Sequence, residues 1–231
     1  MELLECKHLY KSYDDTPVLK DINLKIGRGK IIGLLGKNGV GKSTLIKIIN
    51  DLLVPTEGEV YINGEKTGVN SKKTIAYLPE RTYLDKEMKI TEVFHYFEEF
   101  YDNFNIEKAK KLLKDLNLDI NKRISKMSKG MQEKLQLVLV MSRDVDLYIL
   151  DEPLGGVDPA TRDYILDTIL SNFKEGASMI ISTHLISDIE RILDEVIFMN
   201  DGKIILTSPA DELREKEKSS IDEIFRRYFK C

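Results

Sequence analysis

The stretch that most constrains this chain is residues 36–44, Gly-Lys-Asn-Gly-Val-Gly-Lys-Ser-Thr. It matches G-x-x-x-x-G-K-[ST], a phosphate-binding pattern that has structural meaning only between a buried strand and a helix. Both flanks are predicted: an almost wholly apolar run at 31–35 is typical of a covered parallel strand, and apolar residues then recur at helical spacing until Pro55. The alternative is a glycine-rich turn that joins a strand to a helix and binds nothing. It is disfavoured because every fixed position of the motif is filled.

Each residue type in this loop has a physical task. Gly36, Gly39 and Gly41 let successive backbone N–H groups point into one concavity without a clash from Cβ. The helix predicted to begin near Lys42 adds the positive end of its dipole. Lys42 is placed to reach the β- and γ-phosphates, and the Ser43 hydroxyl to ligate Mg²⁺. We therefore predict a nucleotide site.

Composition excludes several other classes. The 231 residues, 42% hydrophobic and 32% charged, suit one α/β domain with an inserted lobe. A net charge of −4 supplies no basic field for nucleic acid. No apolar run approaches the ~20 residues of a membrane span, and the first ten residues lack a signal-peptide pattern. Cys6 and Cys231 have no metal-ligand spacing, so we expect reduced thiols in a cytoplasmic protein.

The strand signals fall on either side of a helical stretch. Three strand signals precede the helical stretch: the alternation at 22–26, the apolar run at 60–62 before the turn Asn63-Gly64, and the apolar run at 74–78. Buried runs at 147–150 and 177–182 and a hairpin around Asp201-Gly202 follow it. This order predicts a P-loop NTPase fold of the α/β class, with an N-terminal antiparallel β part and a mostly parallel core sheet.

The stretch from about 82 to 142 carries almost only helical signals. We divide the chain into an ATP-binding core, 1–81 and 143–231, and an inserted helical lobe, 82–142. An aromatic stripe at helical spacing in the lobe is interpreted as core, and it consists of Val93, Phe94, Phe97, Phe100, Tyr101 and Phe104. A later helix is predicted to carry Tyr164, Ile165, Ile169 and Phe173 inward. A short terminal amphipathic helix, whose packing partner the sequence leaves open, is predicted from Ile221, Ile224, Phe225 and Tyr228.

Polar residues at the ends of predicted elements are further site candidates. Asp151 and Glu152 follow a buried strand, where a carboxylate can hold Mg²⁺ and a second can act as general base, although a surface acidic pair is the alternative. His184 follows another strand at the same edge; a single histidine is more often structural. Ser128 fits an N-cap, either an ordinary helix start or an anion site. Tyr13 is suited to stacking on a purine or to plain packing.

With these pieces in order, the chain resembles the ATP-binding subunit of ABC transporters along almost its whole length. The resemblance implies ATP and Mg²⁺ as cofactors, adenine stacking on Tyr13, and switch-histidine and D-loop roles for His184 and Asp158. The predicted metal ligands are Ser43 and Asp151, with Glu80 as a further candidate because it places a carboxylate near Mg²⁺; whether Glu80 touches the metal is left open by the sequence. Its implied ATP contacts are Tyr13, Gly36, Lys37, Asn38, Gly39, Val40, Gly41, Lys42, Ser43 and Thr44. The resemblance also implies that the family's signature motif, which contacts the nucleotide bound to the opposite subunit, consists here of Ser128, Lys129, Gly130 and Met131.

In that family two such domains face each other head to tail around two ATP molecules, and their closure pulls on a membrane partner. The resemblance therefore implies a transmembrane permease subunit, a homodimer or heterodimer with a second ATPase subunit, no nucleic acid, and a peripheral position on the inner face of the cell membrane. Three positions depart from the usual pattern. Glu80 stands at the Q-loop in place of Gln, Lys129 in place of a signature Gly, and Met131 in place of a signature Gln.

These variants resemble single-domain ATPases that drive small exporters. A nucleic-acid-associated or translation-linked ABC ATPase is the rival class. It is disfavoured because no sustained heptads lie between Lys42 and Ser128 and because only one ATPase cassette is present. A sensor that binds ATP without turnover is disfavoured by the presence of both Glu152 and His184.

Overall fold

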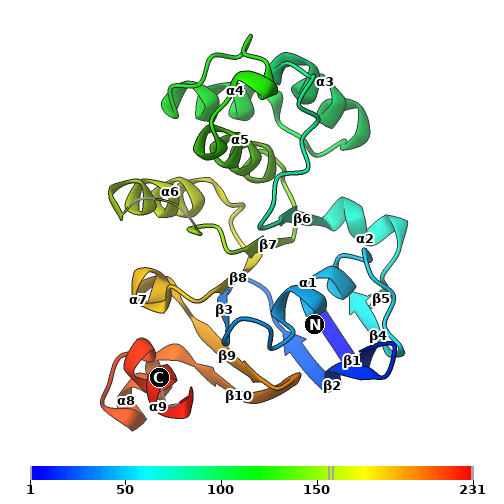
Figure 1. Cartoon of the computed structure of the whole chain (residues 1–231), viewed down its shortest axis with the longest axis vertical. Helices are drawn as coiled ribbons and strands as arrows, with labels where there is room; N and C mark the ends of the chain where they lie inside the picture. Colours follow the sequence, from blue (N-terminus) through cyan, green and yellow to red (C-terminus); the bar gives the residue numbers. More distant parts are fainter. Residues whose placement is uncertain (1, 156, 158, 230–231) are drawn as a thin grey trace.

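The chain folds around two β-sheets (Figure 1), seen in a computed structural model that describes residues 2–155, 157 and 159–229. The smaller sheet is antiparallel, in the order β2 (Thr16–Ile26), β1 (Leu4–Tyr13), β4 (Glu57–Ile62), β5 (Glu65–Lys66). The larger has the order β10 (Lys203–Pro209), β9 (Glu195–Asn200), β3 (Ile31–Leu35), β8 (Ser178–Thr183), β7 (Leu147–Asp151), β6 (Ile75–Leu78). Among the described strands of the larger sheet, β10 pairs antiparallel with β9 and the other pairs are parallel. The predicted fold class is confirmed.

Burial explains which residues form the central strands. Every residue of β3, β7 and β8 is buried, as the continuous apolar runs predict for strands covered on both faces. The N-terminal strands instead alternate buried and exposed residues, because one face is solvated. Cys6 lies among the buried residues of β1, and burial raises the pKa of its thiol to about 12, so the thiol is unreactive. Cys231 lies outside the described residues.

Helices cover the larger sheet and extend beyond it. Figure 1 shows α3, α4 and α5 together beyond β6, and α8 and α9 beside β9 and β10. No described helix is long and apolar enough to cross a membrane. The bounds are α1 (Lys42–Ile49), α2 (Val69–Thr74), α3 (Ile90–Phe100), α4 (Ile106–Asp115), α5 (Lys129–Met141), α6 (Pro159–Asn172), α7 (Ile186–Ile189), α8 (Ala210–Glu217) and α9 (Ile221–Phe229), with 3₁₀ turns at Ile124–Lys126 and Glu190–Ile192.

Several side chains predicted to point inward do not. Phe94 and Phe104 are buried edge to face, with ring centroids 6.0 Å apart, whereas Phe100 ends α3 and is 60% exposed. Tyr164 on α6 is 40% exposed, and its hydroxyl donates to the Asp115 carbonyl. Both expectations were wrong because the helix turns these positions past the edge of the apolar face.

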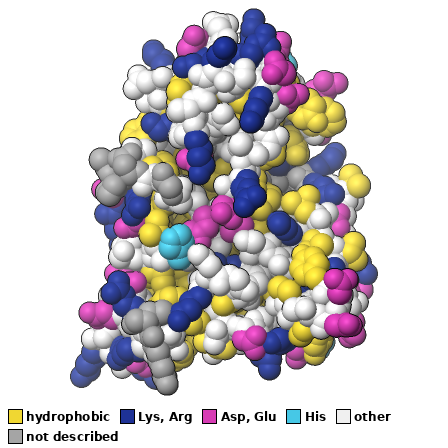
Figure 2. All heavy atoms as spheres, in the orientation of Figure 1, with side chains coloured by type: hydrophobic (Ala, Val, Ile, Leu, Met, Phe, Trp, Pro, Cys, Tyr) yellow, Lys and Arg dark blue, Asp and Glu magenta, His cyan; other side chains and the backbone are white. Residues whose placement is uncertain are grey.

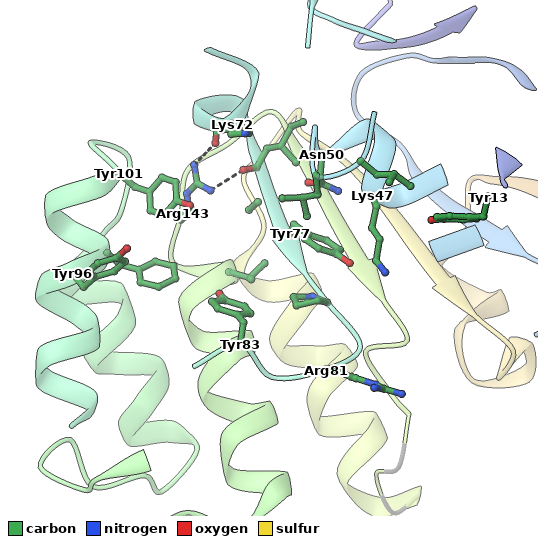
Figure 3. Close-up of a pocket in the computed structure, with 17 residues that line it drawn as sticks. Tyr13, Lys47, Asn50, Lys72, Tyr77, Arg81, Tyr83, Tyr96, Tyr101 and Arg143 are labelled. Carbon is green, nitrogen blue, oxygen red and sulfur yellow. Dashed lines mark hydrogen bonds between the residues drawn. The ribbon is translucent and has the colours of Figure 1, made fainter. Parts of the chain in front are cut away.

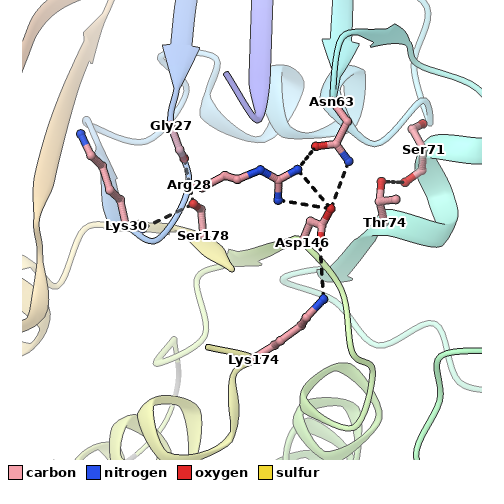
Figure 4. A network of polar contacts seen from close by, with 9 residues as sticks. All are labelled: Gly27, Arg28, Lys30, Asn63, Ser71, Thr74, Asp146, Lys174 and Ser178. Carbon is pink, nitrogen blue, oxygen red and sulfur yellow. Dashed lines mark hydrogen bonds and ion pairs between the residues drawn. The ribbon is translucent and has the colours of Figure 1, made fainter. Parts of the chain in front are cut away.

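A polar network ties the N-terminal sheet to the larger one (Figure 4). Asp146, just before β7, accepts a 3.1 Å hydrogen bond from the Asn63 amide and pairs with Arg28 at 3.4 Å and Lys174 at 3.5 Å. Arg28 also donates to Asn63 at 2.5 Å, so the three residues form a closed triangle. Burial alone raises the pKa of Asp146, but the Asn63 hydrogen bond and the Arg28 and Lys174 charges outweigh it and hold that pKa below its usual value.

We expect Asp146→Asn to lower the free energy of unfolding by about 1 kcal/mol at pH 7, the net worth of a partly exposed network. The folded-state pKa of Asp146 is depressed, so its stabilisation is complete above the unfolded pKa of about 3.9 and is lost as pH falls through the folded value. Urea titrations from pH 7 to pH 3 should show the difference shrinking. Asp102→Asn, at a side chain 91% exposed, is the matched control and should change little.

Candidate functional site

The register of the larger sheet brings three chain segments to one edge. Leu35, the last residue of β3, pairs with Thr183 at the end of β8, and Asp151 at the end of β7 pairs with Ser182. The loop at 36–44, the Asp151-Glu152 pair and His184 therefore all leave the sheet at its carboxyl edge. Ligands bind at this edge in open parallel sheets.

The phosphate-binding loop is shaped by its glycines. Gly39 and Gly41 have φ of 82° and 106°, conformations that side chains with a Cβ rarely adopt. Gly36 lies so close to β9 that an added Cβ would be 2.6 Å from the Met199 carbonyl oxygen. Gly41 then caps α1, which begins at Lys42 as predicted, although α1 ends at Ile49 and leaves Leu52 exposed.

The Lys42 ammonium is held inside the loop. Lys42 is 6% exposed, and its Nζ donates to the carbonyl oxygens of Gly36 at 2.6 Å and Lys37 at 3.1 Å. Burial lowers the pKa of Lys42, and the charges of Glu152, Asp151 and Glu80 act in the opposite direction. The cation is thus surrounded by acceptors at the centre of the loop.

Asp151 is suited to hold a cation. It is 3% exposed, and its Oδ1 is buried with no hydrogen-bond partner among the described residues. Burial raises the pKa of Asp151, a hydrogen bond from Ser43 opposes this, and the Glu152 and Glu80 charges add to the rise. Carboxylate and hydroxyl oxygens suit Mg²⁺, so these residues fit the predicted metal. The described residues contain no cluster of three or more His, Cys, Asp or Glu that could hold a metal ion.

Glu152 is fixed by the end of β8. Its Oε2 accepts a 3.1 Å hydrogen bond from Thr183 Oγ1 and lies 3.0 Å from His184 Nδ1. Its φ is 52°, a left-handed conformation that is uncommon for a residue other than glycine and that turns the carboxylate out of the strand. The sequence analysis assigned no role to Thr183. Its position directly after a predicted buried strand and before the candidate histidine could have indicated that it belongs to the site.

Two hollows meet at Glu152. A cavity of about 380 Å³ contains much of the predicted nucleotide site, and its lining is Val18, Asn38, Gly39, Gly41, Lys42, Ser43, Thr44, Glu80, Glu152 and His184. A neighbouring hollow of about 710 Å³ extends from Glu80, Glu152 and His184 to Lys129 and Gln132 on α5. Figure 2 shows acidic side chains beside a histidine near the middle of the face of the molecule that is seen in Figure 1.

Other predicted residues lie away from the loop cavity. Ser128 caps α5, and its Oγ accepts from the Met131 N–H at 3.3 Å; together with Gly130 it lines a separate hollow near α6. Lys129 pairs with Glu133 on its own helix at 3.5 Å. Tyr13 is 47% exposed at the end of β1 and does not line the loop cavity.

Two residues among the predicted ATP contacts have side chains that do not line the loop cavity. Val40 is buried, and Lys37 directs its Nζ to the Phe229 carbonyl, so the predicted phosphate contacts of their backbone N–H groups stay a prediction. Asp158, predicted in the D-loop, lies outside the described residues.

Comparison with known proteins agrees with this geometry. The family model described as ABC transporter matches residues 19–155. The chain is 31% identical to the ABC-type transporter ATP-binding protein EcsA of Bacillus subtilis strain 168, over 97% of this chain and 96% of that one. It is 28% identical to the SkfA peptide export ATP-binding protein SkfE of the same strain, over 89% and 88%. A solved structure of an ATP-binding subunit of an ABC transporter superposes with a TM-score of 0.87 at 29% identity, covering 97% and 98%.

We expect Lys42→Ala to weaken ATP binding by roughly 100-fold, because it removes a buried cation that can make charge-assisted bonds worth about 3 kcal/mol. Titration with a fluorescent ATP analogue measures the change. The exposed Lys111 on α4, changed to Ala, controls for loss of charge and should leave affinity unaltered. Equal affinities of the Lys42 variant and the wild type would contradict a nucleotide site in this loop.

We expect Glu80→Gln to shift the Mg²⁺ dependence of ATP hydrolysis while leaving ATP affinity nearly unchanged. Glu80 lines the loop cavity and adds negative charge beside Asp151 and Lys42. Hydrolysis rates measured across a Mg²⁺ series, with affinities measured in EDTA, separate the two quantities. If both stay at wild-type values, Glu80 has no part in holding the metal.

Proposed function

The chain belongs to the ABC transporter family as an ATP-binding, ATP-hydrolysing subunit, and we propose that it powers export through a separate transmembrane permease. The observation that carries the ATPase part of this proposal is the convergence of Lys42, Asp151 and Glu152 at one sheet edge, since binding and hydrolysis of a nucleotide need a phosphate cation, a metal ligand and a base together.

In this proposal Glu152 is the general base. Its carboxylate faces the loop cavity, and the Thr183 hydrogen bond and the His184 contact hold one oxygen in place, leaving the other to orient a water molecule. Lys42 binds the β- and γ-phosphates, and Asp151 with Ser43 holds Mg²⁺. The metal, when bound, neutralises charge that develops on the transferred phosphoryl group. His184 is a positioning residue for Glu152.

We further propose that Ser128 acts on the nucleotide of a second ATPase subunit. Ser128 lies at the N-terminus of the 13-residue helix α5, away from the loop cavity of its own chain. A hydroxyl and free N–H groups at the positive end of a helix suit a phosphate. A head-to-tail dimer, of two copies or of two related chains, would bring this end to the partner's loop.

The permease is proposed to dock at a cavity of about 810 Å³ between β6, the end of α1 and the helices α3 and α5 (Figure 3). Lys47, Lys72, Arg81 and Arg143 line it, and no Asp or Glu of the described residues does. Tyrosines supply much of the remaining wall. Lys72 already pairs with Asp51 at 3.2 Å, and the Arg143 guanidinium donates to the Ile75 carbonyl at 2.7 Å. Lys47 and Arg81, together with the aromatic wall, suit an amphipathic segment that carries a carboxylate.

Docking there would place the chain on the inner face of the membrane. The same cavity lies between the core, 1–81 and 143–231, and the helical lobe, 82–142. We propose that the lobe moves relative to the core about Pro79-Glu80 when ATP binds. Export is favoured over import because relatives such as SkfE are named for peptide export.

The test is ATP-driven dimerisation, which separates Glu152 from Ser128. Glu152→Gln keeps the side-chain size but cannot accept a proton, so turnover should fall by roughly 10²–10⁴ while ATP still closes the interface. Sedimentation with Mg·ATP should then show a concentration-dependent dimer. Ser128→Arg in the Glu152→Gln background should abolish that dimer without preventing ATP binding to the monomer.

Glu175→Gln, at an exposed position before β8, is the matched control and should keep wild-type turnover. If the double variant dimerises as well as Glu152→Gln alone, Ser128 does not act in trans. Where closure needs a different second ATPase subunit, the assay includes that subunit.

A further inference from the structure

Two side-chain hydrogen bonds join helix α4 of the lobe to helix α6 of the core. The Tyr164 hydroxyl, on α6, donates to the backbone carbonyl of Asp115 at 2.9 Å. The Lys108 Nζ, on α4, donates to the backbone carbonyl of Asn172 at 2.6 Å. The partners are 49 and 64 positions apart in the chain, so the tertiary structure alone brings them together.

Each of these hydrogen bonds caps the C-terminal end of the opposite helix. Asp115 is the last residue of α4, Asn172 is the last residue of α6, and the chain that follows both ends is described. Carbonyl groups in the last turn of a helix have no N–H partner within that helix. Lys108 also brings a positive charge to the negative end of the α6 dipole. The two helices therefore satisfy each other's ends.

The distance between the two contacts restricts how the lobe can move. They are eight positions apart on α6 (172 − 164), which is about 12 Å at 1.5 Å per residue. One contact would let α4 pivot on α6, whereas two contacts this far apart also fix the direction of α4. A turn of the lobe about Pro79-Glu80 therefore displaces α6 or breaks one of the two hydrogen bonds.

The first turn of α6 is joined to the segments around the proposed base. Arg162 donates through Nε to the Val157 carbonyl at 3.1 Å and through Nη1 to the Asp188 carboxylate of α7 at 2.8 Å. Helix α7 follows His184, whose Nδ1 lies 3.0 Å from Glu152 Oε2. Figure 1 shows α6 between the helices of the lobe and α7. A displacement of α6 therefore reaches the surroundings of Glu152.

We propose that α6 transmits the position of the lobe to the catalytic base, and that Tyr164 and Lys108 are the positioning residues that make this link. The lobe and α6 then move as one unit, and Arg162 carries the movement to Val157 and to α7. The inference rests on the proposed function, in which Glu152 is the base and the lobe moves. It adds a route by which α4 controls hydrolysis without contacting the nucleotide.

Removing one hydrogen bond at a time tests the link through turnover. Tyr164→Phe and Lys108→Met each delete the donor and keep most of the side chain, so kcat should fall about two- to tenfold, the range for one net hydrogen bond, with KM for ATP unchanged. Both contacts are needed to fix α4, so the double variant should lose little more than either single variant. Lys108→Arg keeps a donor and should restore most of the turnover.

Lys111→Met, at an exposed position of α4, is the matched control for the lost charge and should keep the wild-type kcat. Wild-type kcat in both single variants would overturn the link. Losses that multiply in the double variant would overturn it as well, because they would show two independent effects.

A distance measurement tests the link without hydrolysis. Spin labels on Lys111→Cys of α4 and Asp167→Cys of α6, both exposed positions, report the separation of the two helices by pulsed electron paramagnetic resonance. Cys231→Ser removes the terminal thiol, and the buried Cys6 stays unlabelled. One narrow distance should be found both with and without Mg·ATP.

Adding Tyr164→Phe and Lys108→Met together should broaden this distance distribution. A separation that changes with Mg·ATP while both contacts are intact, or one that stays narrow in the double variant, overturns the link. The comparison without nucleotide needs neither binding nor hydrolysis of ATP, so failure of the link is distinct from failure of the proposed function.

Discussion

Parallel pairing of β3, β8 and β7 is the constraint on which the site depends. Their hydrogen-bonded register brings Leu35, Thr183 and Asp151 to one edge although they are far apart in the chain. Each strand is buried on both faces, so a slip of one residue would move every side chain to the opposite packed face, where it does not fit, and would leave backbone groups at the strand ends unpaired. The core therefore holds the phosphate loop, the metal ligand and the base in fixed positions relative to one another.

The charged groups at this edge are buried, and they differ in how well they are paired. The Lys42 ammonium is enclosed by carbonyl oxygens, while Asp151 keeps one carboxylate oxygen without a protein partner. Leaving a buried acceptor unpaired costs about 1–3 kcal/mol, a cost that a bound cation removes. The unpaired oxygen of Asp151 therefore lowers the stability of the folded state without a ligand. Glu152 adds a second cost, because it has a left-handed backbone conformation that few residues other than glycine adopt. Both features are found where a site is prepared for a ligand.

Most of the fold was predictable because its signals are local. The buried strands, the hairpin turns at Asn63-Gly64 and Asp201-Gly202, and the N-cap at Ser128 each follow from a short pattern, and the structure contains them all. Helix faces were predicted less well. Phe100 and Tyr164 fit the apolar periodicity but are exposed, because periodicity gives a direction around a helix and not the width of the surface that covers it.

The sequence by itself determined the class of fold and the chemical types at the site, since a glycine-rich loop with Lys42 and Ser43, and carboxylates after a buried strand, have few other uses. Only the tertiary structure decided which of these side chains meet. It joined Thr183 to Glu152 and turned Lys37 away from the loop cavity to the carbonyl of Phe229. Such contacts depend on strand order and on how α9 packs against β9, and these are set by the burial of many apolar side chains together.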